Sequence, residues 1–138
     1  MTKINQGTNG LHPKLAKYGC GVLSVLWLDD KEWTLEEANN LYQKAVQLKA
    51  ISEDCFIKWE LFLKLVNPNM KFVAFEKPSY KTEPGEWEIQ QWHRNGSSIY
   101  HFIVGDGNNV LYDPTPDSLS RREGLLVSKR IIKYEPKI

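Results

Sequence analysis

The feature of this sequence that most constrains its fold is a change of pattern near Met70. Before Met70, apolar residues recur every three or four positions, which is typical of amphipathic helices. After Met70, short runs rich in β-branched and aromatic residues alternate with turns containing Gly, Pro and Asn. The whole chain has 138 residues, a usual length for one domain. We therefore predict a single α+β domain over residues 1–138, in which N-terminal helices pack on an antiparallel sheet.

Two helices are predicted between residues 34 and 67. Thr34 and Glu37 form a capping-box pattern, which predicts a helix from about residue 35 to residue 49. Ser52 is expected to cap another helix, which ends before Pro68 because a residue that precedes proline avoids the helical conformation. The expected apolar stripe of this second helix is Phe56, Trp59, Leu63 and Val66.

The region before residue 30 is harder to interpret. Residues 22–28 are apolar on all sides, so they predict either a buried helix or a buried strand, and their Leu and Trp content favours the helix. Residues 11–21 contain Pro13, Gly19 and Gly21 and are expected to form a loop. The polar residues 1–10 are expected to be flexible or loosely packed. Strands are expected at residues 71–75, 86–93, 97–104, 109–112 and 125–134, with a turn at 105–108.

Composition limits the classes of partner. The chain has 18 basic and 17 acidic residues, a balance that does not favour nucleic acid as a partner. We interpret its basic cluster as solvated surface. No apolar run reaches the length of a membrane span, and the first ten residues do not resemble a signal peptide, so we expect a cytoplasmic protein without a membrane partner. The residues of the basic cluster are Arg121, Arg122, Lys129 and Arg130.

The two cysteines, Cys20 and Cys55, are expected to be free thiols in a reducing compartment. No Cys/His cluster with metal-ligand spacing is present, and we expect neither a metal nor a cofactor. Cys20 lies between two glycines where the loop meets the apolar segment, so the start of a helix there would favour the thiolate. A buried cysteine without chemistry is the usual alternative, and we favour it for Cys55.

A cysteine nucleophile needs a base, and the chain offers three histidines. His12 lies in the loop before Cys20, and His93 precedes a turn. His101 stands inside an expected strand, where a base would be rigidly held. Asp113 ends the following strand just before a proline, and could accept a hydrogen bond from the imidazole Nδ1–H. If a three-residue hairpin closes at 106–108, His101 lies directly opposite Asp113, whereas a two- or four-residue closure separates them.

Three segments together resemble the papain-like cysteine peptidases. They are residues 18–21 (YGCG) before the apolar segment, 101–104 (HFIV), and 110–114 (VLYDP). The nearest resemblance is to the bacteriocin-processing branch, the peptidase domains of double-glycine-leader exporters, and it would suit a bacterial or phage protein. The resemblance implies a papain-like fold and a catalytic triad of Cys20, His101 and Asp113.

The sequence departs from that family at the position of the oxyanion donor. The family usually carries a glutamine about six residues before the cysteine, where this chain has Lys14. Lys14, Gln6 and Gly19 are therefore our candidates for this part of the site. Tyr18, Gly21 and Tyr100 are candidate substrate-binding residues. We expect core packing for Trp87 and Trp92, although either could line the cleft.

The resulting hypothesis is a thiol protease or amidase that acts on a peptide, an isopeptide or a peptidoglycan stem. The alternative is an inactive peptidase-like scaffold that binds a protein partner as an inhibitor or adaptor. A third possibility, a thiol sensor, requires the Cα atoms of Cys20 and Cys55 to lie within about 7 Å. The oligomeric state and natural substrate are not specified by the sequence.

Overall fold

The computed structural model describes residues 2–97, 100–107, 109–115 and 123–135. Four helices precede five strands, so the chain is an α+β protein as predicted. The helices are α1 (Pro13–Tyr18), α2 (Cys20–Leu28), α3 (Leu35–Gln47) and α4 (Trp59–Val66). The strands are β1 (Lys71–Glu76), β2 (Glu86–His93), β3 (His101–Gly105), β4 (Val110–Tyr112) and β5 (Leu125–Lys133).

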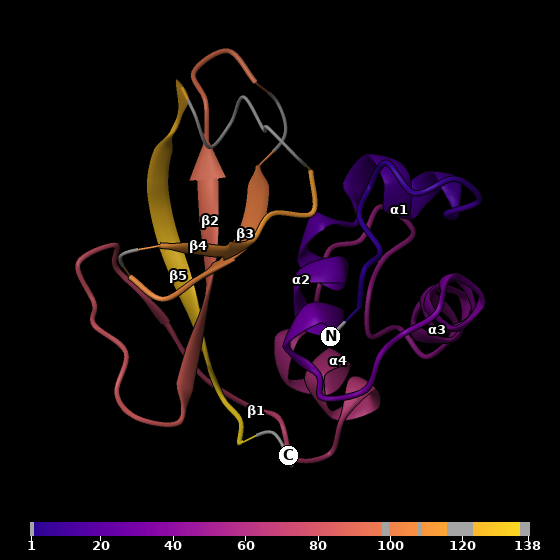
Figure 1. The fold of residues 1–138 in the computed structure, drawn as a ribbon, viewed down its shortest axis with the longest axis horizontal. Coiled ribbons are helices and arrows are strands. Elements are labelled where there is room, and N and C mark those ends of the chain that lie inside the picture. Colours follow the sequence, from indigo (N-terminus) through magenta and orange to yellow (C-terminus); the bar gives the residue numbers. More distant parts are fainter. Residues whose placement is uncertain (1, 98–99, 108, 116–122, 136–138) are drawn as a thin grey trace.

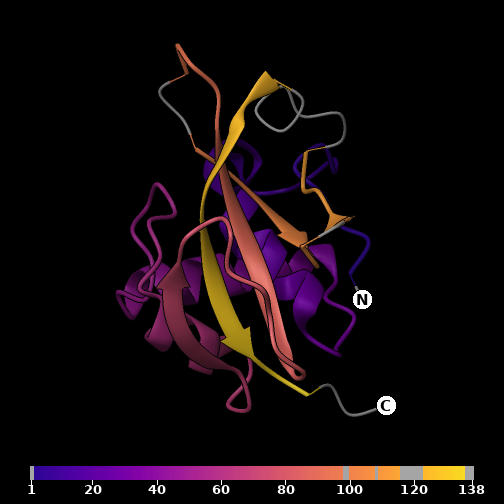
Figure 2. The same ribbon diagram turned by 90° about the vertical axis from the view of Figure 1, so that its left-hand side faces the viewer.

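The strands form one antiparallel sheet in the order β1-β5-β2-β3-β4. The helices cover one face of this sheet, with α2 closest to β3 (Figure 1). After a turn of 90° that brings the sheet toward the viewer, the sheet lies in front of the helices (Figure 2). A two-layer arrangement of this kind buries the apolar stripe of each helix against one face of the sheet.

The buried core explains why α2 is apolar all round. Its side chains from Val22 to Leu26 are almost completely buried between the sheet and the other helices. The predicted helix for residues 22–28 is confirmed, and it starts two residues earlier, at Cys20. The capping box of Thr34 and Glu37 is also confirmed, with both reciprocal hydrogen bonds present at the start of α3.

The loop predicted for residues 11–21 is wrong. Residues 13–18 form α1, in which Pro13 occupies the first turn and His12 accepts a hydrogen bond from the N–H of Lys14. Proline is well tolerated at this position because its missing N–H has no partner inside the helix. Gly19 then separates α1 from α2.

The expected helix after Ser52 starts later, at Trp59. Ser52 instead closes a turn, because its hydroxyl accepts from the N–H of Phe56 at 3.0 Å. The turn is held by a bridge between Ile51 and Ile57, and Phe56 is 78% exposed rather than part of a helical stripe. The loop 52–58 therefore projects from the helical layer.

Two expectations about the surface are also corrected. Thr2 and Ile4 are buried, and the Tyr112 hydroxyl donates to the Ile4 carbonyl at 2.6 Å, so the described part of the opening segment is packed against the domain. Lys129 is only 4% exposed and Arg130 is half-buried, so neither is solvated surface. Arg121 and Arg122 lie outside the described residues.

Candidate active site

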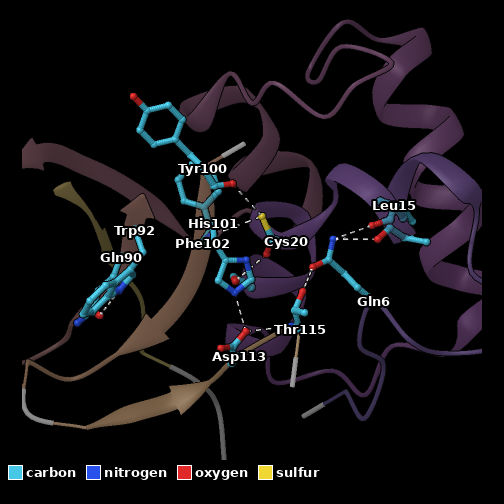
Figure 3. Close-up of polar contacts among 12 residues, drawn as sticks. Gln6, Leu15, Cys20, Gln90, Trp92, Tyr100, His101, Phe102, Asp113 and Thr115 are labelled. Atoms are coloured by element: carbon cyan, nitrogen blue, oxygen red, sulfur yellow. Dashed lines mark hydrogen bonds and ion pairs between the residues drawn. The ribbon is translucent and has the colours of Figure 1, made fainter. Parts of the chain in front are cut away.

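Cys20 is the first residue of α2, and its side chain reaches β3. The backbone N–H of Phe102 donates to Cys20 Sγ at 3.4 Å, and Sγ lies 3.9 Å from the Tyr100 carbonyl oxygen (Figure 3). The sulfur therefore lies against the backbone on both sides of His101, the first residue of β3. This start of β3 lies beyond its pairing with β4, which involves Val104 and Gly105. A thiol at the start of a helix also faces N–H groups that have no partner within that helix.

The structure brings His101 and Asp113 together. His101 Nε2 and Asp113 Oδ1 are 2.6 Å apart, and both side chains are about nine-tenths buried (Figure 3). A second donor, the N–H of Thr115, reaches the same Asp113 oxygen at 2.9 Å. Such an Asx turn is favoured by the sequence Asp-Pro-Thr. It fixes the orientation of the carboxylate that contacts the imidazole.

Two details of the predicted pairing are wrong. The carboxylate contacts Nε2 rather than Nδ1, which leaves Nδ1 for the thiol. The register is also different, because Val104 pairs with Tyr112 and an irregularity separates this pair from Gly105–Val110. Continuing the Val104–Tyr112 register places Asp113 opposite Ile103, two residues from His101. Residues two apart point to the same side of a strand, so the side-chain contact survives the shift.

The protonation of His101 follows from these contacts. Burial lowers its pKa, but hydrogen bonds to Asp113 and Cys20 and attraction to both groups outweigh burial and raise the pKa to about 9. The imidazole is therefore mostly protonated at neutral pH. An imidazolium placed between a thiolate and a carboxylate is the arrangement that activates cysteine nucleophiles.

Gln6, an oxyanion candidate, has a different role in the structure. Its Nε2 donates to the carbonyls of Leu15 and Ala16, both at 3.2 Å, and its Oε1 accepts from the Thr115 hydroxyl (Figure 3). Both ends of the amide are thus occupied, and Gln6 joins the end of α1 to the loop that carries Asp113. It positions the site and has no N–H left for a substrate.

The other two oxyanion candidates, Lys14 and Gly19, do not supply a side-chain donor either. Lys14 binds Asp54 at 2.7 Å on the protein surface. Gly19 is the residue between α1 and α2, and a Cβ atom there would lie 2.6 Å from the Leu15 carbonyl oxygen, so only glycine fits without displacement. Gly19 lets α1 end directly beside Cys20, which leaves the N–H groups at the start of α2 as the available donors.

A cavity of about 230 Å³ adjoins Cys20. Of the predicted substrate-binding residues, Tyr18 and Tyr100 line it. Gly21 does not line it but packs tightly behind the wall, because a Cβ atom there would lie 2.9 Å from Ile57. Most of the lining is aromatic or aliphatic, which suits an apolar group. The complete lining is Tyr18, Cys20, Asp54, Cys55, Phe56, Ile57, Trp59, Gln91, Tyr100 and Phe102.

The second thiol lines the same cavity, although Cys55 was expected to begin a core helix. It lies instead in the projecting loop with a positive φ of 63°. Both thiols are free. Burial, followed by the nearby Cys20 and Asp54, raises the pKa of Cys55 to about 12, so Cys55 stays protonated at neutral pH and is a poor nucleophile.

The remaining histidines are engaged elsewhere. His12 caps the start of α1, and the centroid of its ring lies 4.3 Å from that of Tyr42. His93 Nε2 lies 2.8 Å from the Ser97 carbonyl oxygen, and its ring stacks on Tyr100. Neither shows an interaction with Cys20 among the described contacts, whereas the nearby Cys20 helps to raise the pKa of His101.

Comparison with protein families gives one match. The model of the family described as "Protein of unknown function, DUF261" matches residues 1–134. The chain belongs to the DUF261 family. Neither the curated proteins nor the solved structures yield a match. The DUF261 assignment carries no activity, so any function rests on the geometry of the site.

Two further observations describe the DUF261 chain. Across the described ranges, no helix has both the length and the apolar character needed to cross a membrane. The same residues contain no group of three or more His, Cys, Asp and Glu side chains placed to hold a metal ion.

Several residues around the site were not identified from the sequence. Trp59 and Gln91 line the cavity, while Trp87 and Trp92 do not. The Trp87 indole donates to the Tyr134 carbonyl, and the Trp92 indole donates to Gln90. Gln91 could have been found from the alternation of β2, because it follows Trp87 and Ile89 at inward-facing positions where a polar residue is unusual.

Proposed function

We propose that this protein is a cysteine hydrolase with a papain-like arrangement, in which Cys20, His101 and Asp113 cleave an amide bond. The observation that carries the proposal is the position of one buried imidazole between two partners. His101 bonds Asp113 through Nε2, and interaction with the nearby Cys20 helps to raise the pKa of His101. The nucleophile therefore lies beside the base, and the base bonds the orienting carboxylate.

The proposed chemistry has two steps. The Cys20 thiolate attacks the carbonyl carbon of the substrate, and the amine leaves with a proton taken from the His101 imidazolium. Water then attacks the thioester while the neutral His101 imidazole removes its proton, which expels the Cys20 thiolate, releases the carboxylic acid and restores the thiolate–imidazolium pair. The N–H groups at the start of α2 would stabilise the oxyanion in both steps. Peptides, isopeptides and peptidoglycan stem peptides are all substrates of the required class.

The alternative proposal is a peptidase-like scaffold that binds a protein partner without cleaving it. Two observations favour it. Lys14 stands where the resembling peptidases carry glutamine, and the amide of Gln6 is occupied by Leu15, Ala16 and Thr115. Losing one oxyanion donor typically slows turnover by about 100- to 1,000-fold.

The test is the pH dependence of Cys20 alkylation by iodoacetamide, read by mass spectrometry. We expect rapid labelling of Cys20 at about pH 6, which the His101→Ala variant loses. Cys55 is an internal control because it lines the same cavity with a raised pKa. His93→Ala is a matched control, since His93 stacks on Tyr100 without joining the proposed triad. Slow labelling that rises only near pH 8.5 in wild type and His101→Ala alike would exclude the hydrolase and favour the binding scaffold.

A further inference from the structure

Gln91 places its side-chain amide in the cavity beside Cys20. Hydrogen bonds from β5 fix the orientation of this amide. It lies on β2 opposite Phe102. Its Oε1 accepts from Arg130 Nη1 at 3.1 Å and from the Ser128 hydroxyl at 2.9 Å. Because a guanidinium can only donate, the oxygen of the amide must face Arg130. The amide nitrogen then lies on the other side of the group.

The two N–H donors of Gln91 have no acceptor in the described part of the chain. All the hydrogen bonds of this side chain run through Oε1, to Arg130 and Ser128. Tyr18, Trp59, Tyr100 and other largely apolar side chains form the walls of the cavity around it. A polar donor pair in an otherwise apolar cavity is the usual means by which such a site fixes the orientation of its ligand.

Arg130 strengthens these donors. Its guanidinium lies near the rings of Trp59, Phe75 and Phe102, at 5.7, 5.1 and 5.0 Å from their centroids. Its described hydrogen bonds go to two neutral oxygens, and its Nε is buried with no partner among the described residues. Burial lowers the pKa of Arg130 to about 10, so the group stays charged at neutral pH. A cation bonded to Oε1 polarises the amide and makes its N–H groups better donors.

We propose that Gln91 is a substrate-binding residue, whose amide N–H donates to a main-chain carbonyl oxygen of a peptide while a bulky apolar side chain of that peptide fills the aromatic cavity beside Cys20. This inference rests on the proposed function, because it specifies the substrate of the same site. Arg130 and Ser128 are positioning residues that hold the Gln91 amide in the binding orientation.

Two substitutions of similar size test the donor. Gln91→Glu removes the N–H groups but gives Arg130 a carboxylate partner, so we expect a higher melting temperature. Gln91→Met also removes the N–H groups but deprives Arg130 of an acceptor, so we expect a lower melting temperature. If Gln91 has only a structural role, peptide recognition should follow melting temperature, so Gln91→Glu should keep it and Gln91→Met should lose it. A donor role predicts that both variants lose peptide recognition.

The readout compares two probes of Cys20. N-acetyl-phenylalanine chloromethyl ketone carries a main-chain carbonyl and an aromatic side chain, and iodoacetamide lacks the side chain. We expect the ratio of the two alkylation rates to fall about tenfold in both Gln91 variants. Gln43→Glu, on the exposed side of α3, is a control that makes the same charge change away from the cavity and should retain the wild-type ratio. A ratio that stays at the wild-type value in Gln91→Glu, or that follows melting temperature, would overturn the inference.

A binding measurement separates this inference from the catalytic proposal. Titration of N-acetyl-phenylalaninamide into Cys20→Ser, followed by NMR, needs no reactive thiol. We expect binding in the cavity that Gln91→Glu weakens about tenfold. If Gln91→Glu weakens binding in this way but Cys20 of the wild-type protein is unreactive toward iodoacetamide, the hydrolase is rejected and the binding role of Gln91 is retained. Equal binding with and without the Gln91 donor would reject that role even if Cys20 is reactive.

Discussion

Lys129 and Arg130 are neighbours on β5, but their side chains lie on opposite faces of the sheet and have different partners. Lys129 is buried on the face away from the helices, where its Nζ reaches both Glu88 oxygens, at 3.0 and 3.2 Å, and the Tyr80 carbonyl. Arg130 lies on the helix-covered face, and its hydrogen bonds to described residues go to the neutral oxygens of Gln91 and Ser128. On the face away from the helices, the buried charge of Lys129 is thus paired with Glu88. On the helix-covered face, hydrogen-bond donors are left beside a cavity.

This difference separates a contribution to stability from a contribution to binding. The Glu88 side chain is fully buried, and Gln90 donates to it as well, at 2.6 Å. A buried pair with all its groups satisfied has nothing left to offer a ligand. On the Arg130 side, the N–H groups of Gln91 have no acceptor among the described residues and lie in the cavity beside Cys20, where a substrate would supply one. The predictions below alter the Glu88–Lys129 pair and the Cys20 site one at a time.

The largest effect is expected on the paired face. Glu88→Gln leaves the Lys129 ammonium buried without a carboxylate, which should lower the free energy of unfolding by about 3–5 kcal/mol. Urea denaturation measures the loss. Alkylation of Cys20 in the folded fraction should keep its wild-type pH profile, because Glu88 has no contact with the site. A double variant, Glu88→Met with Lys129→Met, should recover most of the stability; failure to recover it would indicate that the pair contributes more than charge matching.

The second effect is a pH dependence of stability that belongs to the Cys20 site. The folded pKa of His101 is about 9, above the usual 6.5 of a free histidine. Protonation therefore stabilises the fold fully below about pH 6.5, and this stabilisation is lost as pH rises through 9. The contribution amounts to about 3 kcal/mol. Urea midpoints at pH 6 and pH 9.5 should converge in His101→Asn, and an unchanged difference would assign the pH dependence to other groups.

The smallest effect is expected from Asp113→Asn, which makes the same carboxylate-to-amide change as Glu88→Gln. The amide keeps the shape but withdraws the charge that favours the His101 imidazolium. We expect Cys20 alkylation at pH 6 to slow about tenfold, equivalent to ~1.4 kcal/mol. Iodoacetamide kinetics followed by mass spectrometry provide the measurement. If Glu88→Gln slowed alkylation as much as Asp113→Asn, the Glu88–Lys129 pair and the Cys20 site would not be independent.

Much of the fold follows from local patterns in the sequence. Glu86–His93 has the predicted bounds of β2, and the capping box correctly starts α3. The wrong assignments involve residues with two structural uses. Pro13 and Gly19 suggest a loop, yet proline also begins helices and glycine also separates them. Ser52 has the chemistry of a helix cap but closes a turn, a choice that depends on the bridge between Ile51 and Ile57.

The site could be predicted only in part, for reasons of register and burial. Cys20, His101 and Asp113 were identified as residues, and their contact survives because the hairpin register shifts by an even number of positions. An odd shift would have placed Asp113 on the other side of the strand. The burial of Lys129 and Arg130 could not be predicted from a short basic stretch, because each depends on a partner that lies far away in the sequence.

The separation of Cys20 and Asp113 along the sequence has a consequence for protein synthesis. Gln6 and Cys20 are translated before Thr115, Asp113 and His101, which follow much later in the sequence. At the usual rate of elongation, Cys20 precedes Thr115 by roughly 5–20 s. During that interval the nascent chain carries an ordinary cysteine without its base. Under the proposed function, completion of the β3–β4 hairpin is therefore the step at which Cys20 acquires its base.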